Sequence, residues 1–172
     1  MTDHQATPDE EARFAELCRQ AFDLARTGET DALRSLLNVG LSPDVTNESG
    51  DSLLMLASYH GHREAARLLL EQGATPDLKN DRGQTPLAGA CFKGDVEMVE
   101  ILLEGGAGLE ERAGQGMTPL MFAAMFGQVT VVELLLRRGA DPTAVDREGQ
   151  TACTHARNQG STEIARLLDP SA

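Results

Sequence analysis

Apolar residues along this chain gather into clusters that recur every 33 residues, with polar, glycine-containing stretches between them. The last leucine of each cluster keeps the interval: Leu37, Leu70, Leu103 and Leu136. Two series of glycines keep it as well: Gly28, Gly61, Gly94, Gly127 and Gly160, and Gly40, Gly73, Gly106 and Gly139. A period of this length indicates stacked copies of one supersecondary unit, in which each copy buries its apolar side against its neighbours.

The segment 80–112 shows which elements one period predicts. Thr85 can cap the free N–H groups at the start of a helix, and Pro86 suits the first helical position because its φ is already helical. Gly94 favours the end of that helix, since glycine adopts the left-handed backbone at little cost. The six apolar residues in segment 96–103 form a broad stripe, which predicts a second helix that is covered on more than one side. Each period therefore predicts two short helices.

The start of each unit carries a recognisable motif. Segments 83–87 (Gly-Gln-Thr-Pro-Leu) and 116–120 (Gly-Met-Thr-Pro-Leu) resemble the G-x-T-P-L motif of ankyrin repeats, and segments 68–74 and 134–141 resemble the second helix and exit of that family. The resemblance covers nearly the whole chain, from Phe14 to Leu168. It implies an all-α ankyrin-repeat solenoid of helix–turn–helix units with β-hairpin-like fingers. First helices would line a concave side and second helices a convex side.

On this basis we expect a single domain over 14–169. It would contain an N-terminal cap (14–46), internal repeats 47–79, 80–112 and 113–145, and a C-terminal cap (146–169). Polar residues such as Arg19 and Arg157 enter the two end units, as expected for repeats that lack one neighbour. Residues 1–13 predict a disordered acidic tail.

One departure from the family pattern affects contacts between units. The histidine that follows T-P-L in ankyrin repeats is replaced by Met55, Ala88, Met121 and Thr154. The hydrogen bonds of that histidine to the neighbouring backbone are therefore expected to be missing. Their absence should make the junctions between units less rigid.

The net charge of −12 narrows the classes of partner. Acidic residues repel phosphate backbones, so the sequence argues against nucleic-acid binding. A partner with a basic surface would be attracted, although the charge also serves to keep an extended solenoid soluble. The N-terminus has no signal-peptide pattern, and no apolar run approaches the length of a membrane span. We therefore expect a cytoplasmic monomer that does not bind membranes.

The residues that could carry chemistry are few. Cys18, Cys91 and Cys153 lie far apart and have no metal-site spacing. Cys91 stands where ankyrin repeats prefer a small residue and Cys153 replaces the leucine of the motif, so both are expected to be small buried apolar residues. His60 and His62 flank a glycine beside Tyr59, and a metal-dependent regulator or enzyme built on them is an alternative. The simpler interpretation is a solvated turn, and we expect no cofactor. His155 is expected to pack between helices and make a structural hydrogen bond.

The resemblance directs attention to the concave face and the fingers as the partner-binding surface. Residues two before the dividing glycine face the concave side in ankyrin units, which here places Tyr59, Phe92 and Met125 in one row with Phe126 alongside. Exposed aromatic and Met side chains are enriched at interfaces, although the same residues could instead cover helix ends as part of the core. The finger tips would supply a mostly polar rim made of Asp51, Asp81, Arg82, Gln84, Gln115, Met117 and Glu148.

The sequence thus predicts a non-enzymatic module that binds another protein on its concave face and finger tips. A more specific alternative is an acidic inhibitor or immunity-type protein that covers the charged site of a basic toxin or enzyme. A self-assembling structural unit is a further alternative, which the polar end units oppose.

Overall fold

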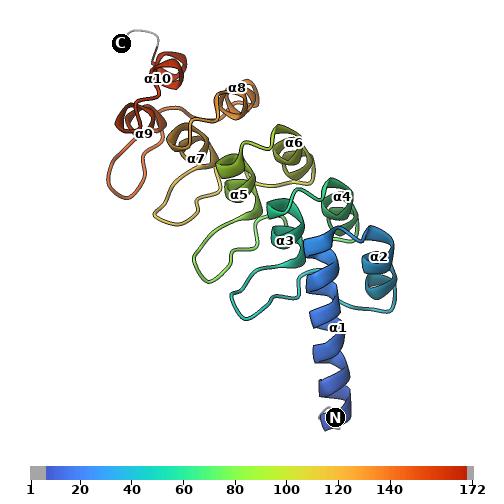
Figure 1. The fold of residues 1–172 in the computed structure, drawn as a ribbon. Coiled ribbons are helices and arrows are strands. Elements are labelled where there is room, and N and C mark those ends of the chain that lie inside the picture. Colours follow the sequence, from blue (N-terminus) through green and yellow to red (C-terminus); the bar gives the residue numbers. More distant parts are fainter. Residues whose placement is uncertain (1–6, 170–172) are drawn as a thin grey trace.

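The structure, a computed structural model, describes residues 7–169. These residues form ten helices: α1 (Pro8–Thr27), α2 (Thr30–Asn38), α3 (Leu53–Tyr59), α4 (Arg63–Glu71), α5 (Pro86–Lys93), α6 (Val96–Glu104), α7 (Pro119–Met125), α8 (Val129–Arg137), α9 (Ala152–Asn158) and α10 (Thr162–Leu168). Consecutive helices pair into five helix–turn–helix units (Figure 1). The all-α repeat architecture expected from the sequence is confirmed.

The helices form two parallel layers. Each odd-numbered helix contacts the next odd-numbered one along the stack, and each even-numbered helix contacts the next even-numbered one. The loops that join successive units extend as fingers from the side of the odd-numbered layer, while the even-numbered helices cover the other side (Figure 1). The solenoid therefore has an inner surface made of first helices and fingers.

The start of each first helix follows the capping chemistry that the sequence predicts. The hydroxyl oxygens of Ser52, Thr85, Thr118 and Thr151 accept hydrogen bonds from the backbone N–H groups three residues later. Pro86 and Pro119 occupy the first helical positions of α5 and α7. Gly94 ends α5 with a left-handed φ of 74°. Local capping rules thus set the start of the first helix in each of these units.

The core lies between the two layers and runs without interruption through the stack. Its largest fully buried side chains recur in each unit, and they include Leu33, Leu68, Leu69, Met98, Leu102, Leu135 and Ile164. Alanines such as Ala65 and Ala123, which are also fully buried, let the helices approach closely. Because each unit buries its apolar side on its neighbours, stability is shared between adjacent units.

Three acidic side chains spaced 33 residues apart join the loops that follow the second helices. Asp44 accepts a hydrogen bond from the backbone N–H of Thr75 (2.8 Å), Asp77 from that of Gly108 (2.9 Å), and Glu110 from that of Asp141 (2.8 Å). Each bond links one unit to the next.

A second series of links joins the ends of the first helices. The ring Nε2 of His62 lies 2.7 Å from the carbonyl oxygen of Arg26, Lys93 Nζ donates to the carbonyl of Tyr59 (2.6 Å), and Gln128 Nε2 donates to the carbonyl of Phe92 (2.9 Å). These side chains satisfy carbonyl groups that helix ends leave without an intrahelical partner.

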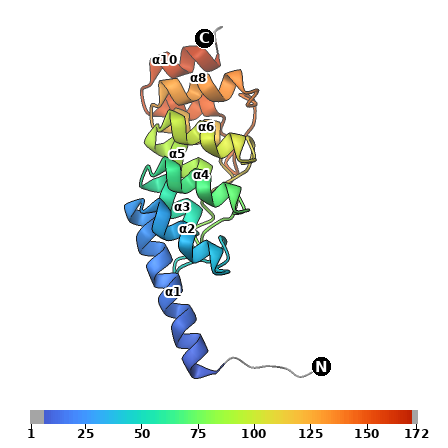
Figure 2. The ribbon, with the colours of Figure 1, turned by 90° about the vertical axis from the view of Figure 1, so that its right-hand side faces the viewer.

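The predicted disordered tail needs a correction. Residues 8–13 form the first turns of α1, which projects beyond the rest of the stack (Figure 2). Thr7 and Glu10 form a reciprocal capping box, and Pro8 stands at the first helical position. The same Thr-Pro start that opens the internal repeats therefore begins this helix earlier than expected. Residues 1–6 of the predicted tail lie outside the described part of the chain.

The missing family histidine is partly replaced in the fourth unit. The backbone N–H of Thr118 donates to the sulfur of Met121 at 3.4 Å, and Met121 is fully buried. A thioether is a weak acceptor, so this contact is a weaker substitute for an imidazole nitrogen.

Candidate functional site: the inner groove

The fingers are short turns whose conformation depends on one side chain each. Asn47, Asn80 and Asp146 occupy equivalent positions, and the Oδ1 atom of each accepts hydrogen bonds from the backbone N–H groups two and four residues later. Ala113 stands at this position in the third finger and cannot do so. There, Arg112 Nη1 donates to the carbonyl oxygens of Gly116 (2.6 Å) and Val145 (2.7 Å) instead.

Adjacent fingers are joined through their backbones. Asp81 N–H donates to the carbonyl of Ser49 (3.1 Å), Gly114 N–H to Gly83 (2.9 Å), and Arg147 N–H to Gln115 (3.2 Å). The fingers therefore form one continuous wall along the inner surface.

Two adjoining hollows lie between this wall and the first helices, and we call them together the inner groove. The first has a volume of about 500 Å³ and lies over α3 and α5, and the second has a volume of about 400 Å³ and lies over α7 and α9. Arg82, Gln84 and Phe122 line both hollows. The groove is thus continuous across the middle of the solenoid.

Three of the predicted apolar contacts are exposed in this groove. Tyr59, Phe92 and Phe126 line the first hollow with 47%, 39% and 43% of their surfaces exposed. The rings of Phe92 and Phe126 pack edge to face with centroids 4.4 Å apart. Aromatic side chains with this exposure are available to a partner, while their mutual packing limits their motion.

Other predicted contacts serve the fold as well. Met125 lines the second hollow but is partly buried against the core, and Met117 is only 8% exposed although it lines the same hollow. Asp51 lines the first hollow, where its Oδ1 accepts from Asn80 Nδ2 at 2.8 Å. Asp81 lies outside both hollows, and its backbone joins two fingers.

The remaining predicted polar contacts lie on the finger wall. Arg82 and Gln84 come from the second finger and stand where the two hollows meet, and both are exposed. Gln115 and Glu148 come from the third and fourth fingers and line the second hollow. The structure thus brings ten of the eleven predicted residues into one groove, with Asp81 outside.

The floor of the first hollow contains residues that the sequence analysis missed. Gly89 lies within α5, and the nearest atom to a methyl group at this position would be in the Tyr59 ring, 3.9 Å away. Phe122, which stands one period later, contributes a half-buried side chain to the lining of the same hollow. A glycine inside a helix reduces helix stability by about 1 kcal/mol relative to alanine. The presence of Gly89 within a predicted helix was therefore the sequence feature that could have indicated this open space.

The two histidines considered for a metal site are held by other contacts. The rings of His60 and His62 stack with centroids 6.3 Å apart, while His62 Nε2 bonds to the Arg26 carbonyl and His60 packs edge-on against Tyr59. Among residues 7–169, His, Cys, Asp and Glu side chains do not gather in threes as a metal ion would require. Burial raises the pKa of the Cys91 thiol, which opposes a nucleophilic role.

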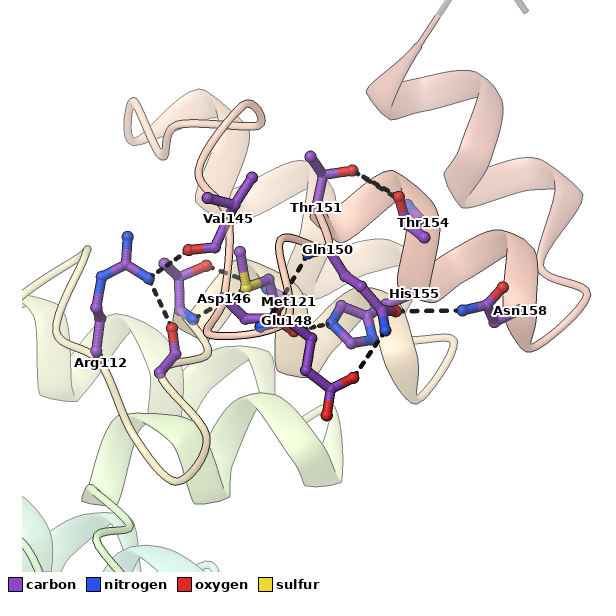
Figure 3. Close-up of polar contacts among 12 residues, drawn as sticks. Arg112, Met121, Val145, Asp146, Glu148, Gln150, Thr151, Thr154, His155 and Asn158 are labelled. Carbon is purple, nitrogen blue, oxygen red and sulfur yellow. Dashed lines mark hydrogen bonds and ion pairs between the residues drawn. The ribbon is translucent and has the colours of Figure 1, made fainter.

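His155 makes the structural hydrogen bond predicted for it. Its Nε2 lies 2.8 Å from Asp146 Oδ2, and both side chains are largely buried (Figure 3). Asp146 thereby connects the fourth finger to α9, since its other oxygen holds the finger turn. The hydrogen bond from the Gln150 backbone lowers the pKa of Asp146 below its ordinary 3.8, with the His155 ring adding to this effect while burial opposes it.

We expect Asp146→Asn to reduce the free energy of unfolding by about 1 kcal/mol at neutral pH, because the charged contact with His155 is lost. Asparagine keeps the Oδ1 acceptor, as Asn47 and Asn80 show in equivalent fingers. A lowered pKa in the folded state means that the stabilisation is complete above the ordinary value and is lost as pH falls through the lowered one.

In urea unfolding, the stabilities of the wild type and Asp146→Asn should therefore converge as the pH falls below the ordinary pKa of 3.8, with exposed Asp31→Asn as the control. A difference in stability that stays constant between neutral and acidic pH would contradict the role given to this carboxylate.

The paired helices, the fingers and the groove between them define a helical-repeat solenoid. The family model for ankyrin repeats matches residues 22–113, 73–146 and 105–171, so this chain belongs to the ankyrin-repeat family. It is also similar to a Pseudomonas aeruginosa protein named for its ankyrin repeats, with 52% identity over 62 residues. That match spans 36% of this chain and 36% of the relative. Within the described residues, every helix is too short or too polar to cross a membrane.

Proposed function

We propose that this protein is a non-enzymatic binding module that holds a partner protein in the inner groove. Ankyrin repeats indicate protein–protein interaction in general. The observation that carries the proposal for this chain is the exposure of Tyr59, Phe92 and Phe126 in one continuous hollow. Clustered aromatic side chains in a groove are typical anchors of interfaces.

The polar residues of the finger wall would fix the orientation of the partner. Arg82, Gln84 and Glu148 are exposed or partly exposed along the groove, and charges at the edge of an interface act mainly on orientation and association rate. The aromatic residues would then supply most of the affinity. Attraction of basic surfaces by the net charge of −12 would assist the approach of a partner over longer distances.

We expect the double variant Tyr59→Ala plus Phe92→Ala to lose at least 90% of partner capture, because truncating two aromatic anchors costs roughly 2 kcal/mol or more in binding. The measurement is quantitative pull-down from a lysate of the host organism, scored on the proteins that the wild type enriches. The control is Phe14→Ala plus Leu167→Ala, which removes exposed apolar side chains away from the groove.

A second variant separates binding from folding. Gly89→Leu keeps every aromatic ring and should favour helix α5, while its side chain enters the first hollow. It should also abolish capture. Undiminished capture by both variants would refute binding in the groove.

A further inference from the structure

One end of the first hollow adjoins a cation, Lys93, and an imidazole, His60, on a protein whose net charge is −12. His60 and Tyr59 line the hollow, and Lys93, the last residue of α5, places its Nζ 4.3 Å from the centre of the Tyr59 ring. Arg26 lies next to this group, since its carbonyl accepts from His62. We call His60, Lys93 and Tyr59 the cationic corner.

The cation of this corner is Lys93, and no carboxylate among residues 7–169 pairs with its Nζ. At neutral pH His60 contributes an uncharged ring that can donate a hydrogen bond, because its pKa is lowered. Lys93 Nζ donates to the carbonyl of Tyr59, a neutral group. Desolvation lowers the pKa of His60, and repulsion by His62, Lys93 and Arg26 lowers it further.

Nearby acidic side chains are already engaged. Asp95 pairs with Arg63 at 2.8 Å, and Asp23 pairs with Arg26 at 3.0 Å. At the other end of the hollow, Asp51 accepts from Asn80. The corner therefore lacks an anion from the described part of this chain.

Aromatic rings adjoin the cationic corner. Phe92, Phe122 and Phe126 line the same hollow, and Gly89 leaves it open beside the Tyr59 ring. An apolar side chain would bury its surface on these rings, and a carboxylate about one residue away would reach Lys93 Nζ and the His60 ring. The aromatic rings and the cationic corner together fit a ligand that carries both an apolar group and a carboxylate.

We propose that the first hollow binds a partner segment in which an apolar side chain stands beside a carboxylate, with the carboxylate at Lys93 and His60. This inference rests on the proposed function and names the chemistry of the bound segment. It differs from the basic partner that net charge alone predicts. Local charge at a contact acts over a few ångströms, whereas net charge acts over a distance of about a Debye length.

The test is selection from a displayed library of random dodecapeptides with the full chain. Enriched peptides should carry Asp or Glu beside an aromatic or aliphatic residue. For one such peptide, replacing the acid by its amide should weaken binding to the wild type by about threefold to tenfold, the range for a partly exposed charged hydrogen bond.

Lys93→Gln should remove this difference between acid and amide peptides. Glutamine removes the charge and keeps a side-chain N–H donor on a shorter side chain, so we expect the fold to be preserved. Arg137→Gln is the matched control, because Arg137 is an exposed cation at the last position of α8. It should leave the difference intact.

The outcomes separate the two proposals. Enrichment of neutral or basic peptides that still require Tyr59 and Phe92 would overturn this inference and leave the binding module in place. Enriched peptides that are indifferent to Tyr59→Ala plus Phe92→Ala would overturn both. A selection that enriches no peptide, or an acid–amide difference that survives Lys93→Gln, would also overturn the inference.

Discussion

Leu102→Asp should abolish the single cooperative unfolding transition of this protein. Leu102 is fully buried in α6, in the central unit of the stack. A carboxylate there would have no partner, and an unpaired buried charge costs about 4 kcal/mol or more. The whole stability of a domain is roughly 5–15 kcal/mol, so the central unit should unfold.

The consequence for the rest of the chain follows from the linear arrangement. The substantial contacts between helices lie within one unit or between adjacent units, so loss of the centre leaves two units on either side. About three repeats are needed for a stable stack, and both ends should therefore become marginal. Hydrogen exchange should show loss of protection over 80–112 and unequal protection at the two ends.

Thr130→Asp is the control for this experiment, because it adds the same charge at an exposed position of the second helix α8. It should unfold in one transition close to that of the wild type. If Leu102→Asp also melted in one unshifted transition, unit-to-unit burial would not be the source of stability.

Gly50→Ala should destabilise the protein by about 3 kcal/mol, whereas Gly149→Ala should cost about 1 kcal/mol. Both glycines stand in fingers with the same φ of 74°, so the cost of a left-handed alanine is equal. The difference lies in the surroundings. A Cβ at Gly50 would lie 2.8 Å from the backbone nitrogen of Asp81. A Cβ at Gly149 would have no described atom within 4 Å apart from those of the two adjacent residues.

The clash at Gly50 involves backbone and cannot be relieved by turning a side chain. The second finger would have to move away, breaking the hydrogen bond from Asp81 N–H to the Ser49 carbonyl. Thermal unfolding of both variants measures the difference. Equal losses of stability would show that the fingers are not packed as closely as the structure places them.

The fold was predictable because the same local rules recur in register. Each Ser or Thr cap, each dividing glycine and each leucine-rich run gives an independent indication of the same unit. The start of α1 was missed because Thr7 and Pro8 stand outside the 33-residue interval, although their chemistry is that of the other helix starts.

The groove was predictable only in part. The period places Tyr59 and Phe92 on one surface, but it does not reveal which finger residues turn inward. Met117 is buried and Asp51 bonds to the next finger, since neighbouring residues of a tight turn point in different directions. The hollow at Gly89 arises from a missing side chain, and the cationic corner combines residues from different units. Both depend on contacts across the stack.

The links between units have a consequence for how such an array can change length. Asp44, Asp77 and Glu110 each reach one interval ahead, and Gln128 reaches one interval back. Deletion of 80–112 would bring Asp77 to the backbone of Asp141 and Gln128 to the carbonyl of Tyr59. Both series of hydrogen bonds between units would therefore form again across the new junction. The number of units can thus change by whole 33-residue repeats, and the length of the inner groove changes with it.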